Sequence, residues 1–531
     1  MSGFGGLREH LSYLDSKGKL WRIRREINKD TELMPLVRWQ FRGLPEAERR
    51  AFLFEKVTDS RGNRYKFPVV VGMYAGSREI YALCMRCQPE EIMDRWVQAQ
   101  REPLEPVLVK EGPVQEEVHL LETLMEHGGL DEFPIPISTP GFDPAPFLTA
   151  AHWLTKDPET GIRNLGNYRA HVKGPLRTGI CIYPEQHLKT HWLKAKQKGK
   201  PLEAAIVIGG SPSYGHVATT KLPYGVDELA VAGGLDKSPV QLVRCKAIGL
   251  EVPANADIVL EGMIRTDILE PEAPFGEFSG YMSERTFYPV FEITCITHRK
   301  EAIYNAFISQ FPPSESTKIK QIGNEAVYFK FLKYDCNISS ISGVAFHEAS
   351  GGSIEYVVIQ LSKPKPWEVW QALNCASGFS SPIGKITVAV DEDIDPGDPD
   401  AVNWALSFRM QPHRDVRIIQ GKTSMSDPSS APPNKSEELV IYPPPCGTSA
   451  LLIDATMKWP YPPTSLPRRD FMERAKQIWE EEGLPRLSPK IPWHGYSLGS
   501  WSEENQEEAE LAIRGDYYKV GEKLASRRVS S

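Results

Sequence analysis

Two carboxylates on a rigid turn are the residues best suited to chemistry in this sequence of 531 residues. Glu272 and Glu277 stand on either side of a Pro-Phe-Gly turn in the segment PEAPFGEF. The apolar, β-branched run YPVFEITCITH follows, which predicts a strand close to the turn. A carboxyl group kept partly out of water can donate a proton, while an ionised neighbour orients a cation. A glutamate pair alone is equally typical of a glycosidase.

A second group of candidates lies in the segment 163–172, which has the character of a strand. Inside a β-domain, the guanidinium of Arg169 needs a carboxylate or phosphate partner. Asn164 lies an odd number of positions away, so a regular strand would send the two side chains to opposite faces. We expect a bulge at Gly166 to turn both toward one site. The alternative is an arginine paired only with a structural glutamate.

Histidines and cysteines at helical spacing offer possible metal ligands. His187 and His191 share one face of an expected helix over 184–199, as a metal pair or as part of a solvated face. Cys84 and Cys87 form a lone CxxC without a second pair, which favours buried core cysteines over zinc. The sequence has no HExxH, P-loop or GxGxxG motif, so zinc proteolysis, Walker-type phosphate binding and a Rossmann unit are unsupported.

The elements that must position these residues change in texture along the chain. Residues 1–130 alternate helical and strand-like runs, including the strand, glycine turn and helix of FPVVVGMYAGSREIYALCMRC. The proline-rich DEFPIPISTPGFDPAP then leads into a mostly β region over 131–318, which we expect to be a barrel interrupted by one helix. An α/β texture returns over 319–531, with a loop at 424–438 and an exposed helical tail. The sequence therefore predicts three domains with these limits.

Composition excludes several classes of protein. The formal charge of -7 argues against general nucleic-acid binding. The basic clusters at 189–200 and at Lys318 and Lys320 are interpreted as solvated helix faces, with phosphate anchoring as the alternative. No apolar run is long enough to span a bilayer and no signal peptide is recognisable. Eight scattered cysteines indicate a reducing compartment, and we expect a cytoplasmic protein.

Several motifs together carry a family resemblance. EAPFGEFSGY resembles the E-x-P-[FY]-G-[ED] motif of the UbiD family of prenylated-flavin decarboxylases, with Ala273 where glycine is usual. NLGNYR, EQHLKTHW, YGVDELAVAGGL and LEVPANADIVLEG resemble further family motifs, and DPDAVNWALSFRMQPHRD and IDATMKWP resemble its C-terminal signatures. The motifs keep the family's order, and the resemblance covers nearly the whole chain.

The resemblance implies a multidomain α+β fold. Its parts are an N-terminal α/β domain, a central split β-barrel similar to flavin reductases that binds prenylated FMN, and a C-terminal α/β domain that forms a homodimer or homohexamer. A flavin prenyltransferase would supply the cofactor.

The resemblance also implies the cofactor and metal ligands. Asn164, His187 and Glu228 would bind a divalent ion (Mn²⁺, Mg²⁺ or Fe²⁺) that bridges to the flavin phosphate, with K⁺ nearby and His191 as a supporting residue. The remaining cofactor contacts fall on Asn167, Tyr168, Arg169, Gln186 and, from the C-terminal domain, Lys458.

The family's catalytic network falls on Arg169, Glu272 and Glu277. Arg169 would hold the substrate carboxylate or the flavin edge, Glu272 would orient Arg169, and Glu277 would protonate the carbon that loses CO₂ from a covalent substrate–flavin adduct. Two substrate classes remain open: an aromatic acyl-CoA such as phthaloyl-CoA, which would give benzoyl-CoA, and a free hydroxybenzoate or other aromatic or acrylic acid. A non-catalytic flavin-binding subunit is the alternative outside enzymes.

Overall fold

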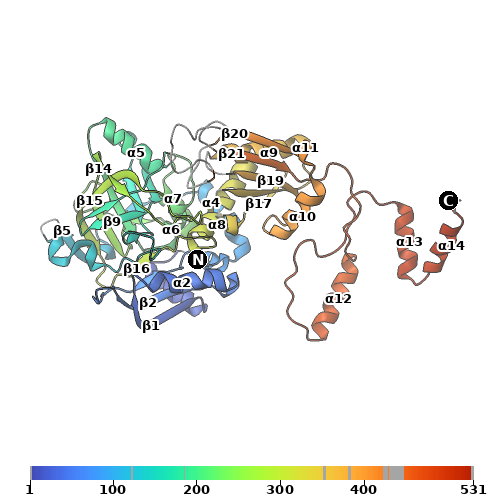
Figure 1. The fold of residues 1–531 in the computed structure, drawn as a ribbon, viewed down its shortest axis with the longest axis horizontal. Helices are drawn as coiled ribbons and strands as arrows, with labels where there is room; N and C mark the ends of the chain where they lie inside the picture. Colours follow the sequence, from blue (N-terminus) through green and yellow to red (C-terminus); the bar gives the residue numbers. More distant parts are fainter. Residues whose placement is uncertain are drawn as a thin grey trace.

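A computed structural model gives the fold, and it describes residues 3–120, 123–184, 186–350, 355–380, 384–422, 429 and 448–527. Within this part of the chain the strands form four sheets. Figure 1 shows a body built on these sheets and a C-terminal tail that runs away from it. The fold is therefore multidomain α+β, as expected from the sequence. The loop expected at 424–438 lies, apart from residue 429, outside the described residues.

The first domain is an α/β layer with sheet order β1-β2-β3-β16. The strand, turn and helix expected from FPVVVGMYAGSREIYALCMRC are confirmed as β3, the glycine turn after it and α3. Cys84 is buried and Cys87 half-buried, as expected for core cysteines. The elements are α1 (Leu7–Ser16), β1 (Leu20–Asn28), α2 (Leu33–Gly43), β2 (Ala51–Thr58), β3 (Val69–Val71), α3 (Arg78–Cys84), α4 (Ile92–Arg101) and, from later in the chain, β16 (Tyr304–Ala306).

The central sheet is antiparallel throughout, with the order β6-β9-β10-β15-β14-β11-β7-β8 and β5 attached to β15. It curls into a half-barrel (Figure 1). Its longest strands form a hairpin in which Glu272 pairs with Thr286, so the Pro-Phe-Gly turn lies at the hairpin end. The strands are β5 (Glu117–Leu120), β6 (Phe147–Leu148), β7 (His152–Lys156), β8 (Arg163–Asn167), β9 (Ala170–Gly174), β10 (Arg177–Gly179), β11 (Leu202–Ile208), β14 (Ile258–Glu272) and β15 (Thr286–His298).

Three helices, not one, interrupt this sheet in the described chain: α5 (His187–Gln197), α6 (Pro212–Thr219) and α7 (Glu228–Asp236). The expectation of a single helix is wrong because α6 and α7 are buried almost all round and show no polar face. Glycine lets α7 approach its neighbour closely, since a Cβ at Gly234 would lie 2.9 Å from the Cα of Ala99. A small adjacent sheet has the order β13-β12-β4, formed by β4 (Val107–Leu108), β12 (Gln241–Arg244) and β13 (Glu251–Pro253).

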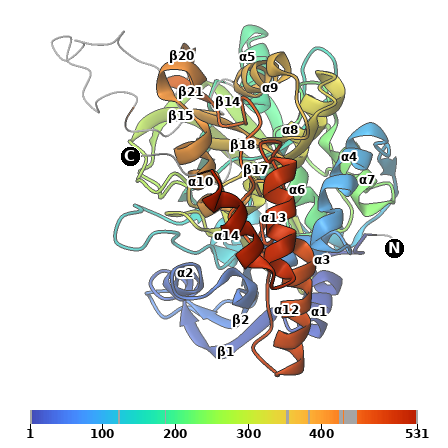
Figure 2. The same cartoon turned by 90° about the vertical axis from the view of Figure 1, so that its right-hand side faces the viewer.

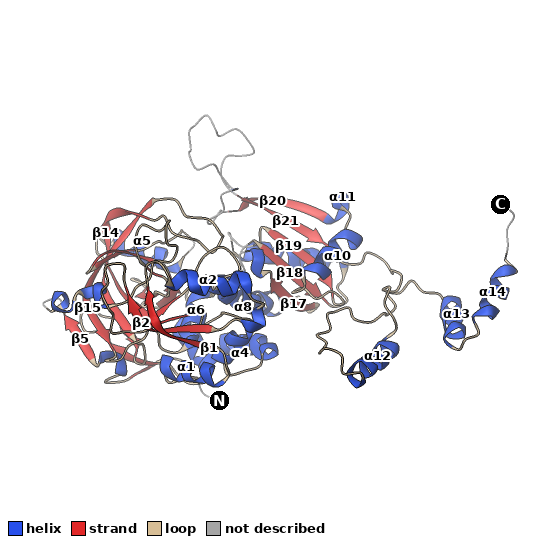
Figure 3. Cartoon of the chain, turned by 60° about the horizontal axis from the view of Figure 1, so that its bottom comes forward, coloured by secondary structure: helices blue, strands red, loops and turns tan. Residues whose placement is uncertain are grey.

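The C-terminal domain is a mixed sheet with the order β17-β18-β19-β21-β20 and helices packed on it. The predicted limit at residue 318 falls within α8 (Glu315–Lys330), which lies between the body's domains in Figure 3. The other elements are β17 (Ile341–Phe346), β18 (Tyr356–Leu361), α9 (Pro366–Phe379), β19 (Ile386–Asp391), α10 (Pro399–Arg409), α11 (Pro412–Asp415), β20 (Val416–Lys422) and β21 (Thr448–Asp454).

The tail carries α12 (Arg469–Glu481), α13 (Glu503–Ile513) and α14 (Tyr517–Ala525). Figure 1 shows these helices running away from the C-terminal domain, and in Figure 2, which is viewed from the tail's side, they lie in front of the body. Neither α12 nor α13 has a buried residue, which agrees with the exposed helical tail expected from the sequence. In the described residues, every helix is too short or too polar to cross a bilayer.

Candidate active site

A cavity of about 240 Å³ lies between the half-barrel, the Pro-Phe-Gly turn and α8. Most of the residues that the sequence nominated line it: Asn164, Asn167, Tyr168, Arg169, Gln186, His187, Glu228 and Glu277. Glu272 lies directly behind the lining and is fully buried. The structure thus brings together residues from β8, the segment between β8 and β9, the beginning of α5 and the residue before it, α7 and the turn after β14.

Arg169 is held between the two carboxylates of the turn. Its Nε and Nη2 donate to Oε1 and Oε2 of Glu272 at 2.9 and 2.7 Å, which is a bidentate pair. Its Nη1 donates to Glu277, and the guanidinium carbon lies 5.0 Å from the centre of the Phe275 ring. Burial by itself lowers the pKa of Arg169. The nearby Cys181 and the Glu272 carboxylate raise this pKa by more than burial lowers it, so the net pKa lies above the ordinary value for arginine. The guanidinium therefore stays charged, and both Arg169 and Glu277 line the cavity.

Asn164 and Arg169 reach the same cavity because the regular strand conformation is interrupted between them. β8 ends at Asn167 and β9 begins at Ala170, and each pairs with a different neighbour. The bulge expected at Gly166 is wrong, because β8 pairs with β7 without a shift of register. A Cβ at Gly166 would lie 2.3 Å from the Tyr168 hydroxyl, so glycine leaves room for the tyrosine ring.

The Pro-Phe-Gly turn is fixed from the proline-rich connector. Asp143 accepts hydrogen bonds from the backbone nitrogens of Thr139 at 2.6 Å and Gly276 at 3.2 Å, next to Glu277. Burial raises the pKa of Asp143 to about 6. Ala273 adopts φ +79°, a conformation that favours glycine. Sequence reasoning missed Asp143, because an aspartate in a proline-rich segment carries no motif of its own.

Asn164, His187 and Glu228 lie together at one end of the cavity. His187 Nδ1 is 3.7 Å from Glu228 Oε1, and Glu228 Oε2 accepts from the Leu165 backbone at 2.9 Å. Burial raises the pKa of Glu228, an effect that His187 opposes. The Asn164 side-chain nitrogen is buried without a hydrogen-bond partner. An amide, an imidazole and a carboxylate make a ligand set suited to a hard or borderline divalent cation.

Further amides line the cavity beside this group. Asn167 donates to the Thr149 carbonyl at 3.1 Å, while its Oδ1 is buried without a partner. Gln186 accepts from the Tyr183 backbone at 2.8 Å, just before α5 begins. Buried polar atoms in folded proteins are normally bonded to protein, water or ligand, so these atoms of Asn164 and Asn167 are available to an occupant of the cavity.

His191 is not part of the cavity lining. Its Nδ1 lies 2.9 Å from the Thr155 hydroxyl, and burial lowers its pKa to about 4. Tyr224 packs edge-on against both His187 and His191, at ring distances of 5.1 and 6.0 Å. His191 thus packs behind His187 instead of forming a second ligand on the same helix face.

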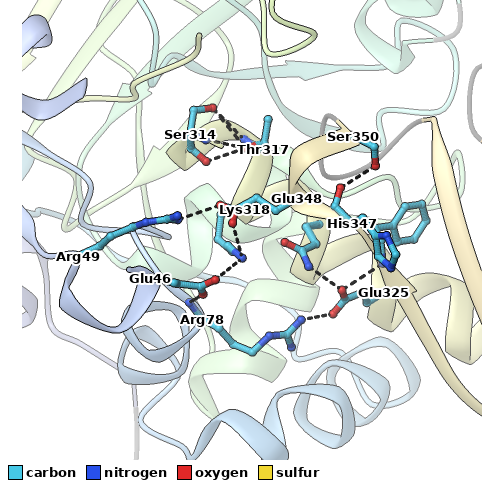
Figure 4. A network of polar contacts seen from close by, with 12 residues as sticks. Glu46, Arg49, Arg78, Ser314, Thr317, Lys318, Glu325, His347, Glu348 and Ser350 are labelled. Atoms are coloured by element: carbon cyan, nitrogen blue, oxygen red, sulfur yellow. Dashed lines mark hydrogen bonds and ion pairs between the residues drawn. The ribbon is translucent and has the colours of Figure 1, made fainter. Parts of the chain in front are cut away.

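The two lysines of α8, Lys318 and Lys320, have different surroundings. Lys318 is buried and lies 2.8 Å from Glu46 and 3.1 Å from Glu348, in a network that joins α8 to the first domain (Figure 4). Lys320 instead lines the cavity, with its ammonium 3.4 Å from the centre of the Phe278 ring. Burial lowers the pKa of Lys320 to about 7. The expectation of a solvated face is therefore wrong for both lysines.

Lys458 lies apart from the other nominated residues. It does not line the cavity, and its amine lies 2.7 Å from Asp454 Oδ1 and 2.8 Å from the Thr456 carbonyl. These local acceptors, at the end of β21, satisfy the amine where it stands. The structure therefore does not bring Lys458 to the other predicted cofactor contacts.

Comparison with known proteins places the whole body of the chain beside one group of enzymes. Models of three domains of 3-octaprenyl-4-hydroxybenzoate carboxy-lyase (UbiD) match it: the N-terminal domain at residues 11–100, the Rift-related domain at 106–312 and the C-terminal domain at 319–455. An uncharacterized protein of Archaeoglobus fulgidus is 31% identical, over 85% of this chain and 92% of the relative.

Solved structures agree with the family models. An evolved dimeric form of the UbiD-class enzyme HmfF from Pelotomaculum thermopropionicum, solved with prFMN, is 32% identical. Its TM-score is 0.72, over 86% of this chain and 95% of that chain. Vanillic acid decarboxylase of Sedimentibacter hydroxybenzoicus in closed form is 25% identical, with a TM-score of 0.76 over 91% and 99% of the two chains.

Proposed function

Because the chain belongs to the UbiD family of carboxy-lyases, we propose that it catalyses the reversible, non-oxidative decarboxylation of an aromatic carboxylic acid, with prenylated FMN bound in the cavity. The observation that carries this proposal is the position of Arg169 between Glu272 and Glu277 at the cavity wall. An arginine can bind a carboxylate, and a carboxyl group beside it can move a proton.

The residues at the end of the cavity fit the cofactor. Asn164, His187 and Glu228 would hold a divalent cation, Mn²⁺, Mg²⁺ or Fe²⁺, that neutralises the flavin phosphate, with K⁺ nearby. Asn167, Tyr168 and Gln186 would line the ring, and the partnerless polar atoms of the two asparagines support such an occupant. When bound, prenylated FMN supplies the electron sink that an aryl carbon lacks when its bond to CO₂ breaks.

The chain's own residues would orient the acid and move the proton. Arg169 binds the substrate carboxylate, and its bidentate pair with Glu272 fixes the plane of the guanidinium. The bond between the ring carbon and the carboxylate breaks, CO₂ leaves, and Glu277 donates a proton to that carbon. Water then reprotonates Glu277. The same steps in reverse describe carboxylation.

The charges around the cavity favour a free aromatic acid as the substrate class. Of the lysines that suggested a phosphate-bearing partner, Lys194 lies 2.8 Å from Asp157 and Lys318 is buried between two glutamates. Lys320, which faces the cavity next to Phe278, would attract a second polar group of a small aromatic acid. A hydroxybenzoate meets these requirements.

An aromatic acyl-CoA such as phthaloyl-CoA is the second candidate. Lys189 and Lys196 on α5 stack on Trp192 at 4.4 and 5.0 Å and have no carboxylate partner among the described ion pairs. They would be available for CoA phosphates. Incubation of holoenzyme with phthaloyl-CoA, free phthalate and a hydroxybenzoate separates the two classes, because only one class should release CO₂.

The decisive test uses protein co-expressed with a flavin prenyltransferase. We expect Glu277→Gln to retain the flavin, seen by absorption and mass, and to lose turnover by about 10²–10⁴-fold. His187→Ala should lose the flavin itself. Full activity of Glu277→Gln would refute its role as proton donor. A flavin-loaded wild type that exchanges CO₂ with no aryl acid would favour a non-catalytic subunit, and activity without flavin on a glycoside would favour a glycosidase.

We also propose that the protein is a homodimer or homohexamer built through its C-terminal part. The tail helices stand apart from the body and expose Phe471, Ile478 and Trp479, which a second copy would cover. Light scattering of the full chain and of a chain ending at residue 458 tests this, since the shorter chain should dissociate. The domain limits 1–130, 131–318 and 319–531 stay part of this proposal.

A further inference from the structure

A cluster of two histidines and a glutamate lies far from the cavity, at the other end of the β14–β15 hairpin. His119 is on β5, His298 ends β15 and Glu132 ends a short helical turn, Gly129–Glu132. β15 has 13 residues, so at about 3.4 Å per residue His298 is on the order of 40 Å along the strand from the Pro-Phe-Gly turn. Figure 1 shows β5 at the end of the body opposite to the tail.

Strand register brings the two histidines onto one face. His119 is paired with Ile296, so His298 is its diagonal neighbour across the antiparallel ladder. Their ring centres are 5.0 Å apart. Glu132 reaches both: its Oε2 lies 3.5 Å from His119 Nδ1 and its Oε1 lies 3.5 Å from His298 Nε2. The three ligand atoms all lie within 4.8 Å of one another.

The atoms that converge are buried and have no hydrogen-bond partner. His119 is 5% exposed and His298 is 1% exposed. His119 Nδ1, Glu132 Oε2 and His298 Nε2 are all without a partner among the described residues. His298 Nδ1 lies 2.7 Å from the Arg299 carbonyl, to which it donates, so Nε2 is the ring nitrogen that is left to face Glu132. The three side chains thus face one another with polar atoms that no other described residue satisfies.

This geometry matches a tetrahedral metal site. Bonds of about 2.0–2.1 Å to zinc place neighbouring ligand atoms about 3.4 Å apart. Each histidine nitrogen lies 3.5 Å from one oxygen of Glu132, His119 from Oε2 and His298 from Oε1, so a small rotation of the carboxylate or the rings brings all three onto one ion. The hydrogen bond from His298 to the Arg299 carbonyl is the kind of outer contact that orients a histidine ligand. Phe67 and Phe133 hold the His298 ring edge-on at 5.4 and 5.7 Å, which fixes its rotamer in apolar surroundings.

We infer that His119, Glu132 and His298 form a binding site for a divalent transition metal of the zinc type, with water as the fourth ligand. The site is structural. It joins β5 and the turn 129–132 to the end of β15, and through Phe67 it contacts the first domain. It is separate from Asn164, His187 and Glu228, which differ in composition and lie at the cavity.

Zinc content measured by inductively coupled plasma mass spectrometry tests the inference. Wild type, dialysed against micromolar zinc, should retain one equivalent of zinc that His119→Gln and Glu132→Gln lack. Mutation of residues that only contact a metal ligand costs about 10–100-fold in metal affinity, so loss of a ligand itself should cost more than about 100-fold. His187→Ala is the matched control and should keep this equivalent. Zinc should raise the melting temperature of wild type and His187→Ala by an increment that the two site variants lack.

Cobalt gives an independent readout that does not depend on folding of the histidine variant. Wild type loaded with Co²⁺ should show the visible absorption of a tetrahedral site, which the nearly isosteric Glu132→Gln should lose while it keeps its circular dichroism. An anomalous zinc peak between the three side chains would locate the ion. The inference is overturned when wild type binds no zinc at micromolar concentration, or when both folded variants bind as much as wild type.

Discussion

Replacing Glu272 by glutamine probes whether this buried carboxylate acts on chemistry through Arg169. Glu272 has no exposed surface and accepts two hydrogen bonds from the guanidinium, at 2.9 and 2.7 Å. Glutamine keeps the shape but offers one acceptor, and its amide group then faces a cation. The variant therefore isolates the charge and the second bond from the volume of the side chain.

The expected magnitude follows from those two bonds. A hydrogen bond to a charged group contributes about 1.5–3 kcal/mol, and removal of one partner of a buried ion pair costs about 3–5 kcal/mol. Since Glu277 still faces Arg169, we expect the free energy of unfolding to fall by about 3 kcal/mol. A displacement of about 1 Å of a positioning group costs on the order of 10²-fold in rate. We therefore expect kcat/KM to fall about 100-fold while the flavin stays bound.

The assay compares CO₂ release, flavin content and denaturant unfolding in Glu272→Gln and in Glu270→Gln. Glu270 lies on the same strand, 2.9 Å from Lys173 and 3.1 Å from Arg177, but it is 27% exposed. Glu270 is partly exposed whereas Glu272 is fully buried, so this control should retain its activity and lose less stability than Glu272→Gln. Wild-type kcat/KM in Glu272→Gln would refute the reasoning, as would an equal loss in the control.

Other changes test the cavity residues one at a time. Burial lowers the pKa of Lys320 from 10.5 to about 7, so between these values the unfolded chain holds a proton that the folded chain lacks, and stability rises with pH. Lys320→Met should lose that rise with pH, and its free energy of unfolding at pH 7 should be about 2–4 kcal/mol higher than that of wild type. Its KM should also be higher. Thermal unfolding across pH and steady-state kinetics measure these changes. In Gly166→Ala the new methyl would lie 2.3 Å from the Tyr168 hydroxyl. We therefore expect the free energy of unfolding to fall by about 1–3 kcal/mol and the protein to bind less flavin. Gly174→Ala, with nothing within 4 Å, is its control. Ala273→Gly should raise the melting temperature slightly at unchanged activity, because φ +79° costs alanine about 1–2 kcal/mol and glycine loses about 0.5–1 kcal/mol in entropy.

Motifs and periodicity were sufficient for some of the strands and for most of the residues that line the cavity. The strand predicted from YPVFEITCITH is β15, and β11 and β14 have the same apolar, β-branched character. Residue spacing could not explain how Asn164 and Arg169 meet. Their convergence depends on the interruption between β8 and β9, because β8 pairs with β7 whereas β9 pairs with β6 and β10.

Burial explains the residues that the sequence misassigned. Lys318 and Lys320 look alike in a basic helix, yet acids from other parts of the chain neutralise Lys318, whereas Lys320 lies over an aromatic ring at the cavity. Asp143 supports the Pro-Phe-Gly turn from a connector more than a hundred residues earlier. These roles depend on tertiary contacts, which local patterns do not encode.

The first domain has a part in the site although none of the cavity's lining residues belongs to it. Glu315, at the start of α8, accepts hydrogen bonds from the backbone nitrogens of Gly72 and Tyr74, both at 2.9 Å. Lys318, one turn later, is held by Glu46 of the same domain. Since Lys320 follows on the same rigid helix, its place in the cavity is set by contacts on the helix face turned away from the substrate. The size and charge of the cavity on that side thus depend on how the first domain packs against α8.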